Sequence, residues 1–133
     1  MASLTAPRDD SRQTGDYVEV NAGTNTIYHG GAVTIASSGF AHQGVAAEPF
    51  VGVAQETVSG DLVRVYTEGV FSFDCAAGVG VQANVGKGVV LTDDHTVALD
   101  TRAANSVRIG VITKIESTTS VRVKINVGIP AAA

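Results

Sequence analysis

Apolar and polar residues alternate with a period of two along much of this chain. The clearest run spans residues 62–75, where Val63, Val65, Phe71 and Phe73 take odd positions and polar residues take most even ones. Successive side chains on a β-strand point to opposite faces of a sheet, so this alternation predicts a half-buried strand. We expect one continuous apolar face inside the domain, formed by Val63, Val65, Phe71, Phe73 and Cys75.

The opposite face of the same run mixes apolar and charged side chains. That composition fits a surface that meets a partner protein, and a covering loop from the same chain would explain it equally well. Gly69 interrupts the inner face without a side chain, which predicts a bend or a bulge. The candidate subunit-interface residues on this face are Leu62, Arg64, Tyr66 and Val70.

Shorter alternating runs, bounded by Gly, Asn, Asp and Ser, recur through the rest of the chain. Residues 40–48 are weakly patterned and read as a loop, and Pro49 marks the start or edge of a strand. A single helical turn is expected near 82–85. The predicted strands cover 17–20, 26–28, 32–36, 50–58, 89–92, 96–99, 107–115 and 121–127.

Composition agrees with strands, because 21 Val, 7 Ile and 13 Thr stand against only 4 Leu. β-Branched side chains fit a pleated surface and crowd a helix. We therefore predict an all-β protein. At 133 residues it is expected to form one domain over residues 16–128, with residues 1–15 as an extended N-terminal arm and 129–133 as a C-terminal tail.

A weak internal similarity appears at an offset of 58 residues. Placing residues 52–69 on 110–127 gives six identities over 18 positions, including Gly52 on Gly110 and the Val-Arg-Val run at 63–65 on the one at 121–123. Two hairpins of similar build would produce this match, and so would chance resemblance between two Val-rich hairpins.

Charge and targeting signals exclude several classes of protein. The net charge is −4 and the nine basic residues are scattered, so no basic stripe can neutralise a row of phosphates, and we expect no nucleic-acid partner. The N-terminus has no apolar signal-peptide region, and the chain has no span of about 20 apolar residues, so we expect no membrane partner. The single cysteine cannot form an internal disulfide, which favours a reducing compartment.

The residues that could carry catalysis do not form a recognisable motif. His29, His42 and His95 are far apart, and the Asp93-Asp94-His95 run reads as a solvated hairpin tip. Cys75 shares the parity of Phe71 and Phe73 and reads as a small core residue. We predict no catalytic residue, no cofactor site, no metal site and no enzymatic activity.

Five segments in order resemble one known family. They are Gly23-Thr24-Asn25-Thr26-Ile27-Tyr28-His29-Gly30-Gly31-Ala32-Val33, Phe50-Val51-Gly52-Val53-Ala54-Gln55-Glu56-Thr57, the strand Val63 to Asp74, the hairpin from Val85-Gly86-Lys87 to Thr96-Val97, and the closing hairpin after Gly110-Val111. Together the order and spacing of these segments over about residues 16–128 are similar to the capsid decoration, or cement, proteins of tailed bacteriophages.

This resemblance implies a fold, a role and a set of partners. It implies a small β-barrel or β-tulip-like domain of short antiparallel strands that acts as a structural virion protein on the outer capsid surface, made in the host cytoplasm. It also implies a homotrimer at the threefold and quasi-threefold axes of the expanded head, clamping neighbouring major capsid protein subunits. The arm departs from the family, and its candidate capsid-contact residues are Leu4, Pro7, Arg8 and Arg12.

The alternative class is a carbohydrate- or host-surface-binding β module of the tail-fibre or lectin type. Such modules stack sugar rings on exposed aromatic side chains. With no Trp and only three Tyr in the chain, the composition argues against this alternative.

Overall fold

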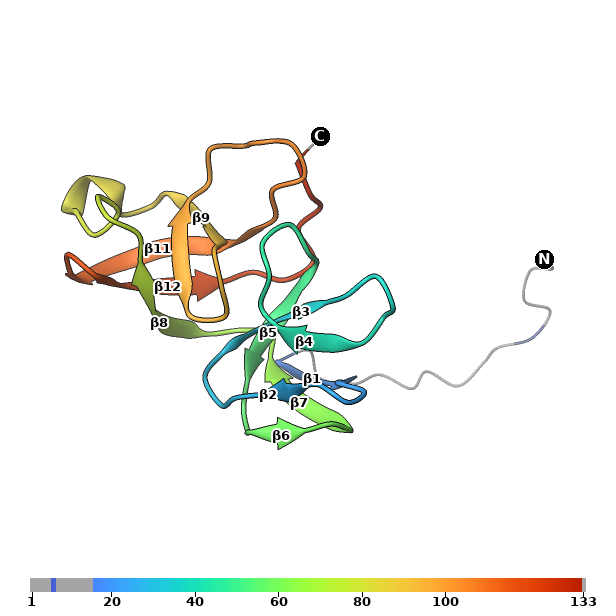
Figure 1. The fold of residues 1–133 in the computed structure, drawn as a ribbon. Helices are drawn as coiled ribbons and strands as arrows, with labels where there is room; N and C mark the ends of the chain where they lie inside the picture. Colours follow the sequence, from blue (N-terminus) through green and yellow to red (C-terminus); the bar gives the residue numbers. More distant parts are fainter. Residues whose placement is uncertain (1–5, 7–15, 133) are drawn as a thin grey trace.

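The computed structural model describes residue 6 and residues 16–132, and every sheet in it consists of short strands (Figure 1). The prediction of an all-β protein is confirmed. The N-terminal arm lies outside the described residues, apart from residue 6. The strands are β1 (Tyr17–Asn21), β2 (Thr26–Ile27), β3 (Ala32–Ile35), β4 (Ala41–Gln43), β5 (Phe50–Ala54), β6 (Val58–Ser59), β7 (Leu62–Tyr66), β8 (Val70–Cys75), β9 (Gly88–Leu91), β10 (Thr96–Leu99), β11 (Arg108–Ser117) and β12 (Ser120–Ile125).

The predicted elements differ from the observed ones at the segments 40–48 and 50–58, and at the run 62–75 described below. The segment expected to be a loop at 40–48 contains β4, a strand of three residues that pairs with β3. The strand expected at 50–58 divides into β5 and β6. The predicted helical turn is present as a 3-10 helix at Gln82–Asn84. Within the described residues, no helix is long and apolar enough to cross a membrane.

The first half of the chain forms an open, fully antiparallel sheet with the order β1-β7-β5-β3-β4. Its edges are β1 and the short β4. A separate two-stranded ribbon pairs β2 with β6. These strands occupy the lower part of the molecule in Figure 1.

The second half forms a ring in which each strand pairs with two others, in the order β10-β8-β12-β11-β9 and back to β10. Four of these pairs are antiparallel and the β10–β8 pair is parallel. The expected antiparallel pairing therefore holds for every other strand pair of the described residues. Strand directions cannot alternate all the way around a ring of five strands, so one pair has to be parallel.

The chain has two hydrophobic cores, one for each sheet. Val63 and Val65 are fully buried in the first core, whereas Phe73 is buried in the second, with Phe71 and Cys75 packed against it. The expected single apolar face from Val63 to Cys75 is thus wrong. β7 ends at Tyr66 and β8 begins at Val70 in the other sheet. Gly69, at φ +129°, lies at the bend between them, as predicted.

The two sheets share one strand order and one register. Read from β1, the first is β1-β7-β5-β3-β4, and read from β8, the second is β8-β12-β11-β9-β10. The pairs Val53↔Tyr66 and Ala54↔Val65 recur 58 residues later, at Val111↔Lys124 and Ile112↔Val123. The fold thus contains a structural repeat, with β1, β3, β4, β5 and β7 as the first repeat and β8, β9, β10, β11 and β12 as the second.

The two repeats also agree in how β3 pairs with β4 and β9 with β10, and in the position of a register shift. The pairs of β3 with β4 recur 56 residues later in β9 with β10, and Val33↔Gly52 corresponds to Val89↔Gly110. The β3–β5 ladder shifts register between Val33 and Thr34, and the β9–β11 ladder shifts register between Arg108 and Gly110. A Val-rich composition does not by itself fix the register of strand pairs. The agreement therefore supports the interpretation that the 58-residue similarity reflects two hairpins of similar build.

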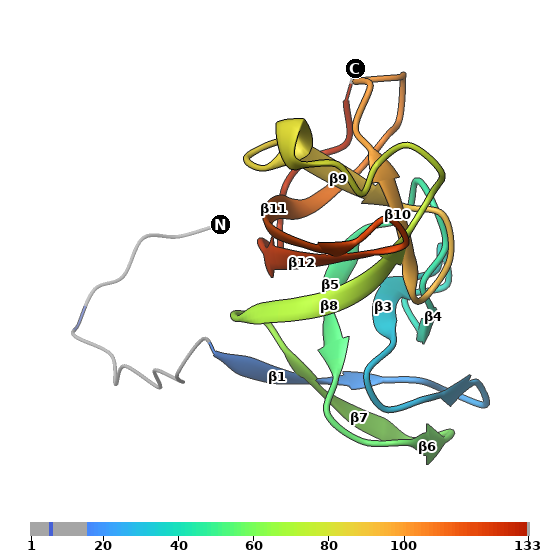
Figure 2. The ribbon, with the colours of Figure 1, turned by 90° about the vertical axis from the view of Figure 1, so that its left-hand side faces the viewer.

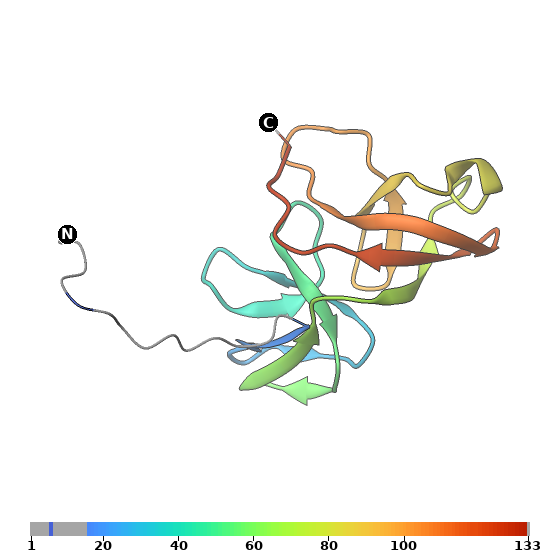
Figure 3. The same cartoon turned by 180° about the vertical axis from the view of Figure 1, so that it is seen from behind.

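The two repeats meet where the tip of the β9–β10 hairpin contacts β3. The N–H of Ala32 donates a hydrogen bond of 2.7 Å to the carbonyl oxygen of Asp94. Three residues of the first repeat, Ala32, Phe50 and Val53, are buried in the core of the second. Seen from behind, β11 and β12, in orange and red, lie above and to one side of the open sheet (Figure 3).

Candidate interaction surface

The outer face of the β1–β7 pair exposes several large side chains. Tyr17 is 43% exposed and lies directly opposite Tyr66, which is 41% exposed, while Leu62 at the other end of β7 is 49% exposed. Alternate residues of β7 are buried in the first core, so the period of two fixes which side chains face outward. We call Tyr17, Leu62, Arg64 and Tyr66 the β1–β7 face.

Ring contacts organise the side chains of this face. The guanidinium carbon of Arg64 lies 5.9 Å from the centroid of the Tyr17 ring, within the range of a cation–π contact. The ring of Tyr66 lies 5.6 Å from that of Phe71, which packs against the second core. Tyr66 thus joins the β1–β7 face to the other sheet across the bend.

A second exposed face lies on the outside of β8, β12 and β11. Lys124 stands opposite Val70 on one side and opposite Val111 on the other, and all three are exposed. In the next row Arg122 stands between Ser72 and Lys114. We call Val70, Val111, Lys114, Arg122 and Lys124 the outer ring face. Figure 2 shows β8 and β12 above β1 and β7, so the two faces adjoin.

Glu116 neutralises one of the three cations of the outer ring face. Its carboxylate accepts hydrogen bonds from Ser72 Oγ at 2.7 Å, from Ser120 Oγ at 3.2 Å and from Arg122 Nε at 3.2 Å. These bonds, that from Ser72 above all, lower the pKa of Glu116. Among residues 16–132, neither Lys114 nor Lys124 forms an ion pair, so both ammonium groups face solvent.

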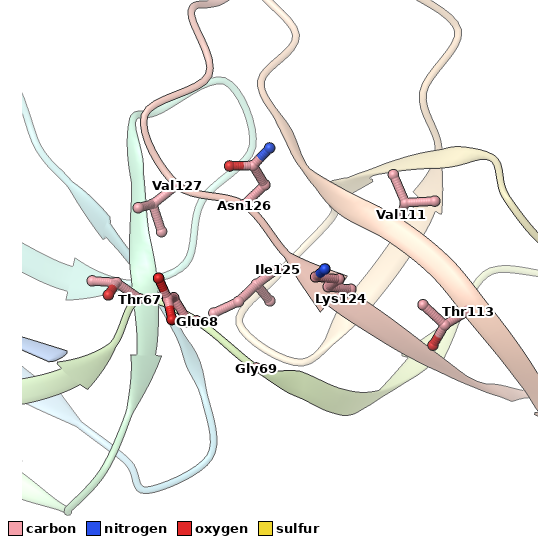
Figure 4. Close-up of a pocket in the computed structure, with 9 residues that line it drawn as sticks. All are labelled: Thr67, Glu68, Gly69, Val111, Thr113, Lys124, Ile125, Asn126 and Val127. Atoms are coloured by element: carbon pink, nitrogen blue, oxygen red, sulfur yellow. The ribbon is translucent and has the colours of Figure 1, made fainter. Parts of the chain in front are cut away.

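A groove of about 760 Å³ runs between the bend and the outer ring face (Figure 4). Thr67, Glu68 and Val127 lie on one side of it and Val111, Thr113 and Lys124 on the other. One wall therefore carries a carboxylate and the other an ammonium group, with apolar groups beside each.

The tip of the β9–β10 hairpin gathers the one group of potential metal ligands found among the described residues. Asp93, Asp94 and His95 bring one ligand atom each to within 4.8 Å of one another. His95 Nδ1 lies 2.9 Å from Asp94 Oδ1 and 3.1 Å from Asp93 Oδ1. The hydrogen bond with Asp94 and the charges of Asp93, Asp94 and Asp74 raise the pKa of His95.

The carboxylate of Asp93 accepts hydrogen bonds from backbone N–H groups of this hairpin tip. Partial burial acts to raise the pKa of Asp93, but hydrogen bonds from His95 and Thr96, together with the charge of His95, outweigh it and lower the pKa. The carboxylate is thus already engaged in the turn, as expected of an Asp at a hairpin tip.

The other chemically active side chains lie apart. Cys75 is half-buried against the second core, where desolvation, with the nearby charge of Asp74, raises the pKa of its thiol and makes the thiolate scarce at neutral pH. His42 pairs with Glu48 at the edge strand β4. Among the described residues, the groove is lined by Glu68 and two smaller hollows are lined by His42 and by Asp100, so none of the three gathers two or more of the histidines, Cys75 and the carboxylates.

All four candidate interface residues are exposed, and the structure divides them between two adjoining faces. Leu62, Arg64 and Tyr66 belong to the β1–β7 face and Val70 to the outer ring face. Sequence reasoning missed Val111 and Lys124, although the similarity at an offset of 58 residues aligns Val111 with Val53 and Lys124 with Tyr66. The candidate capsid-contact residues Leu4, Pro7, Arg8 and Arg12 lie outside the described residues.

These features define an all-β protein with a broad exposed surface of apolar and charged side chains. The family model of the phage cement protein matches residues 12–127. The chain belongs to this family, and it is therefore a structural component of the phage capsid. No curated protein matches the chain.

Proposed function

We propose that this cement protein binds the outer surface of the expanded phage head and clamps neighbouring major capsid protein subunits. The observation that carries the proposal is the family match over residues 12–127, which includes every strand of both repeats. The protein is made in the host cytoplasm and added to the head as a folded subunit. Leu4, Pro7, Arg8 and Arg12 of the N-terminal arm are its proposed contacts with the capsid.

The same proposal includes a homotrimer at the threefold and quasi-threefold axes of the head. The β1–β7 face supports it, because Leu62, Tyr66 and Tyr17 leave large apolar groups exposed on a small monomer. Covering such a surface with a second copy removes apolar area from water and protects the sheet edge at β1.

Binding alone is sufficient for the cementing role. A ligand that binds only the expanded lattice stabilises that state, by about 2.7 kcal/mol per site when the free ligand exceeds Kd a hundredfold. Because a head offers many equivalent sites, modest contacts at each one add to a large resistance against internal pressure. No bond needs to be made or broken in this mechanism.

Sedimentation with purified heads that lack this protein tests the proposal. We expect saturable binding of the protein to expanded heads and no binding to unexpanded ones, since only the expanded lattice presents the complete site. Equal binding to both forms, or to neither, would contradict the clamping role.

A further inference from the structure

The two repeats differ at the seam, the place where the two end strands of a sheet can pair. In the second repeat the seam is closed, because β8 and β10 pair in parallel. The N–H of Ala76 donates a hydrogen bond of 3.0 Å to the carbonyl oxygen of Val97. The N–H of Asp74 donates one of 2.9 Å to the carbonyl oxygen of His95. In the first repeat the equivalent strands, β1 and β4, are the ends of an open sheet.

The registers of the strand pairs identify the counterparts of Ala76 and Val97 in the first repeat. Aligning β1 on β8 and β4 on β10 by these registers places Gly23 at the position of Ala76 and Ala41 at the position of Val97. A hydrogen bond from the N–H of Gly23 to the carbonyl oxygen of Ala41 would therefore close the first sheet. Among residues 16–132 no such main-chain bond is present.

The first repeat follows the path of the second up to the residue before this position. The N–H of Ala22 donates a hydrogen bond of 2.7 Å to the carbonyl oxygen of Asp61. Its counterpart Cys75 donates one of 3.0 Å to the carbonyl oxygen of Thr119, which corresponds to Asp61. The next residue, Gly23, has a φ of +60°, in the left-handed region that favours glycine. The paths of the two repeats therefore separate at this one residue.

Two asparagine side chains bond to the groups that a closing bond would join. The N–H of Gly23 donates a hydrogen bond of 2.8 Å to Oδ1 of Asn21. The carbonyl oxygen of Ala41 accepts one of 3.0 Å from Nδ2 of Asn25. Because the donor and the acceptor each have a side-chain partner, neither group is left without a hydrogen bond while the strands stay apart.

The packing around the seam leaves room for a local movement. Ala22 and Ala41, on its inner side, are both fully buried in the first core. The ring of Phe40 lies over Gly23, since a Cβ atom there would stand 3.1 Å from Cδ1 of the ring. The side chain of Asn25 borders a hollow of about 430 Å³. Pairing of the two strands would therefore shift this turn without rebuilding the core behind it.

We propose that Asn21, Gly23 and Asn25 form a latch that holds the first sheet open, and that the sheet closes into a ring when the latch is released. Closure pairs β1 with β4 in parallel, as β8 pairs with β10, and the N–H of Gly23 then donates to the carbonyl oxygen of Ala41. The protein thus combines a fixed ring with a sheet that has two states. Leu62 of the β1–β7 face lies opposite Asn21, so the latch adjoins that exposed surface.

NMR couplings across hydrogen bonds, which detect single N–H···O=C bonds, test the latch in the isolated protein. For the wild type we expect no coupling from the N–H of Gly23 to the carbonyl carbon of Ala41. The coupling from Ala76 to Val97 should be present and is the internal control for a closed seam. Corrected for intrinsic rates, the amide of Gly23 should exchange with deuterium at least about tenfold faster than that of Ala76, because it bonds to an exposed side chain.

The variant Asn21→Ala/Gly23→Ala/Asn25→Ala removes the latch, and Thr24→Ala is the matched control because it changes an exposed residue of the same turn. We expect the triple variant to gain a coupling from residue 23 to Ala41 and to slow the exchange of that amide at least about tenfold. Thr24→Ala should behave like the wild type. The single variant Asn25→Ala frees only the carbonyl of Ala41 and should slow the exchange at residue 23 at least about twofold.

A coupling from Gly23 to Ala41 in the wild type overturns the proposal, because the seam would already be closed. So does an Asn25→Ala or triple variant that keeps the coupling from Ala76 to Val97 and gains no protection at residue 23. Loss of the coupling from Ala76 to Val97 in the triple variant overturns it too, since the turn would then support the whole fold and not a separate latch. All of these measurements use the isolated protein, so their failure leaves the proposed capsid function standing.

Discussion

At the scale of single residues, the pKa of His95 is raised by its surroundings. This side chain lies at a hairpin tip whose Asp94 carbonyl accepts a hydrogen bond from Ala32 of the other repeat. Three carboxylates surround the imidazole, so the folded protein holds the proton more tightly than the unfolded chain does. Since the folded pKa is raised, this stabilisation is fully present below about pH 6.5 and is lost as the pH rises through the folded pKa.

We therefore expect an NMR titration of His95 to give a pKa above 6.5, the usual value for the side chain. Asp94→Asn removes the largest cause and should lower that pKa, whereas Asp61→Asn, at an exposed site in another turn, should leave it unchanged. A His95 pKa at or below 6.5, or one that does not respond to Asp94→Asn, would refute this account of the tip.

At the scale of elements, the repeat depends on two glycines that allow strands to approach closely. A Cβ atom on Gly52 would stand 2.1 Å from the carbonyl oxygen of Tyr66, and one on Gly110 would stand 2.2 Å from that of Lys124. These carbonyls belong to equivalent residues of β7 and β12. The two hairpins thus share the same close backbone contact, which only glycine can accommodate.

Gly52→Ala and Gly110→Ala should each lower the free energy of unfolding by about 3 kcal/mol or more, because the backbone has to move away from the new methyl group. Gly78→Ala is the control, since Gly78 has a positive φ, as Gly52 does, but a Cβ added there would meet no atom within 4 Å; its cost should be about 1 kcal/mol. Urea unfolding measures all three, and equal losses would show that the close approach is unimportant.

Sequence patterns predicted most strands because the period of two and the turn residues are local properties. They did not predict that the run from Val63 to Cys75 serves two cores, because only the bend at Gly69 decides which sheet each half joins. β4 was missed because its three residues carry no alternation. Val111 looks like any other outward strand residue until its repeat equivalent, Val53, is seen to be buried.

At the scale of the whole molecule, the protein consists of two similar β units that differ in their edges. The second repeat pairs β10 with β8 and so has no free edge, whereas the first leaves β1 and β4 at the ends of an open sheet. The β1–β7 face and the groove adjoin on one side of the molecule. The molecule therefore exposes two different surfaces, as the proposed contacts with several neighbours on a capsid lattice would require.

The central claim is that this protein cements the expanded head by occupying its threefold positions. Cryo-electron microscopy of heads with and without the protein tests it most directly. The account predicts added density at the threefold and quasi-threefold positions on the outer surface, made of copies that contact each other and bridge neighbouring capsid subunits. Identical maps, or added density confined to a single capsid subunit, would contradict it.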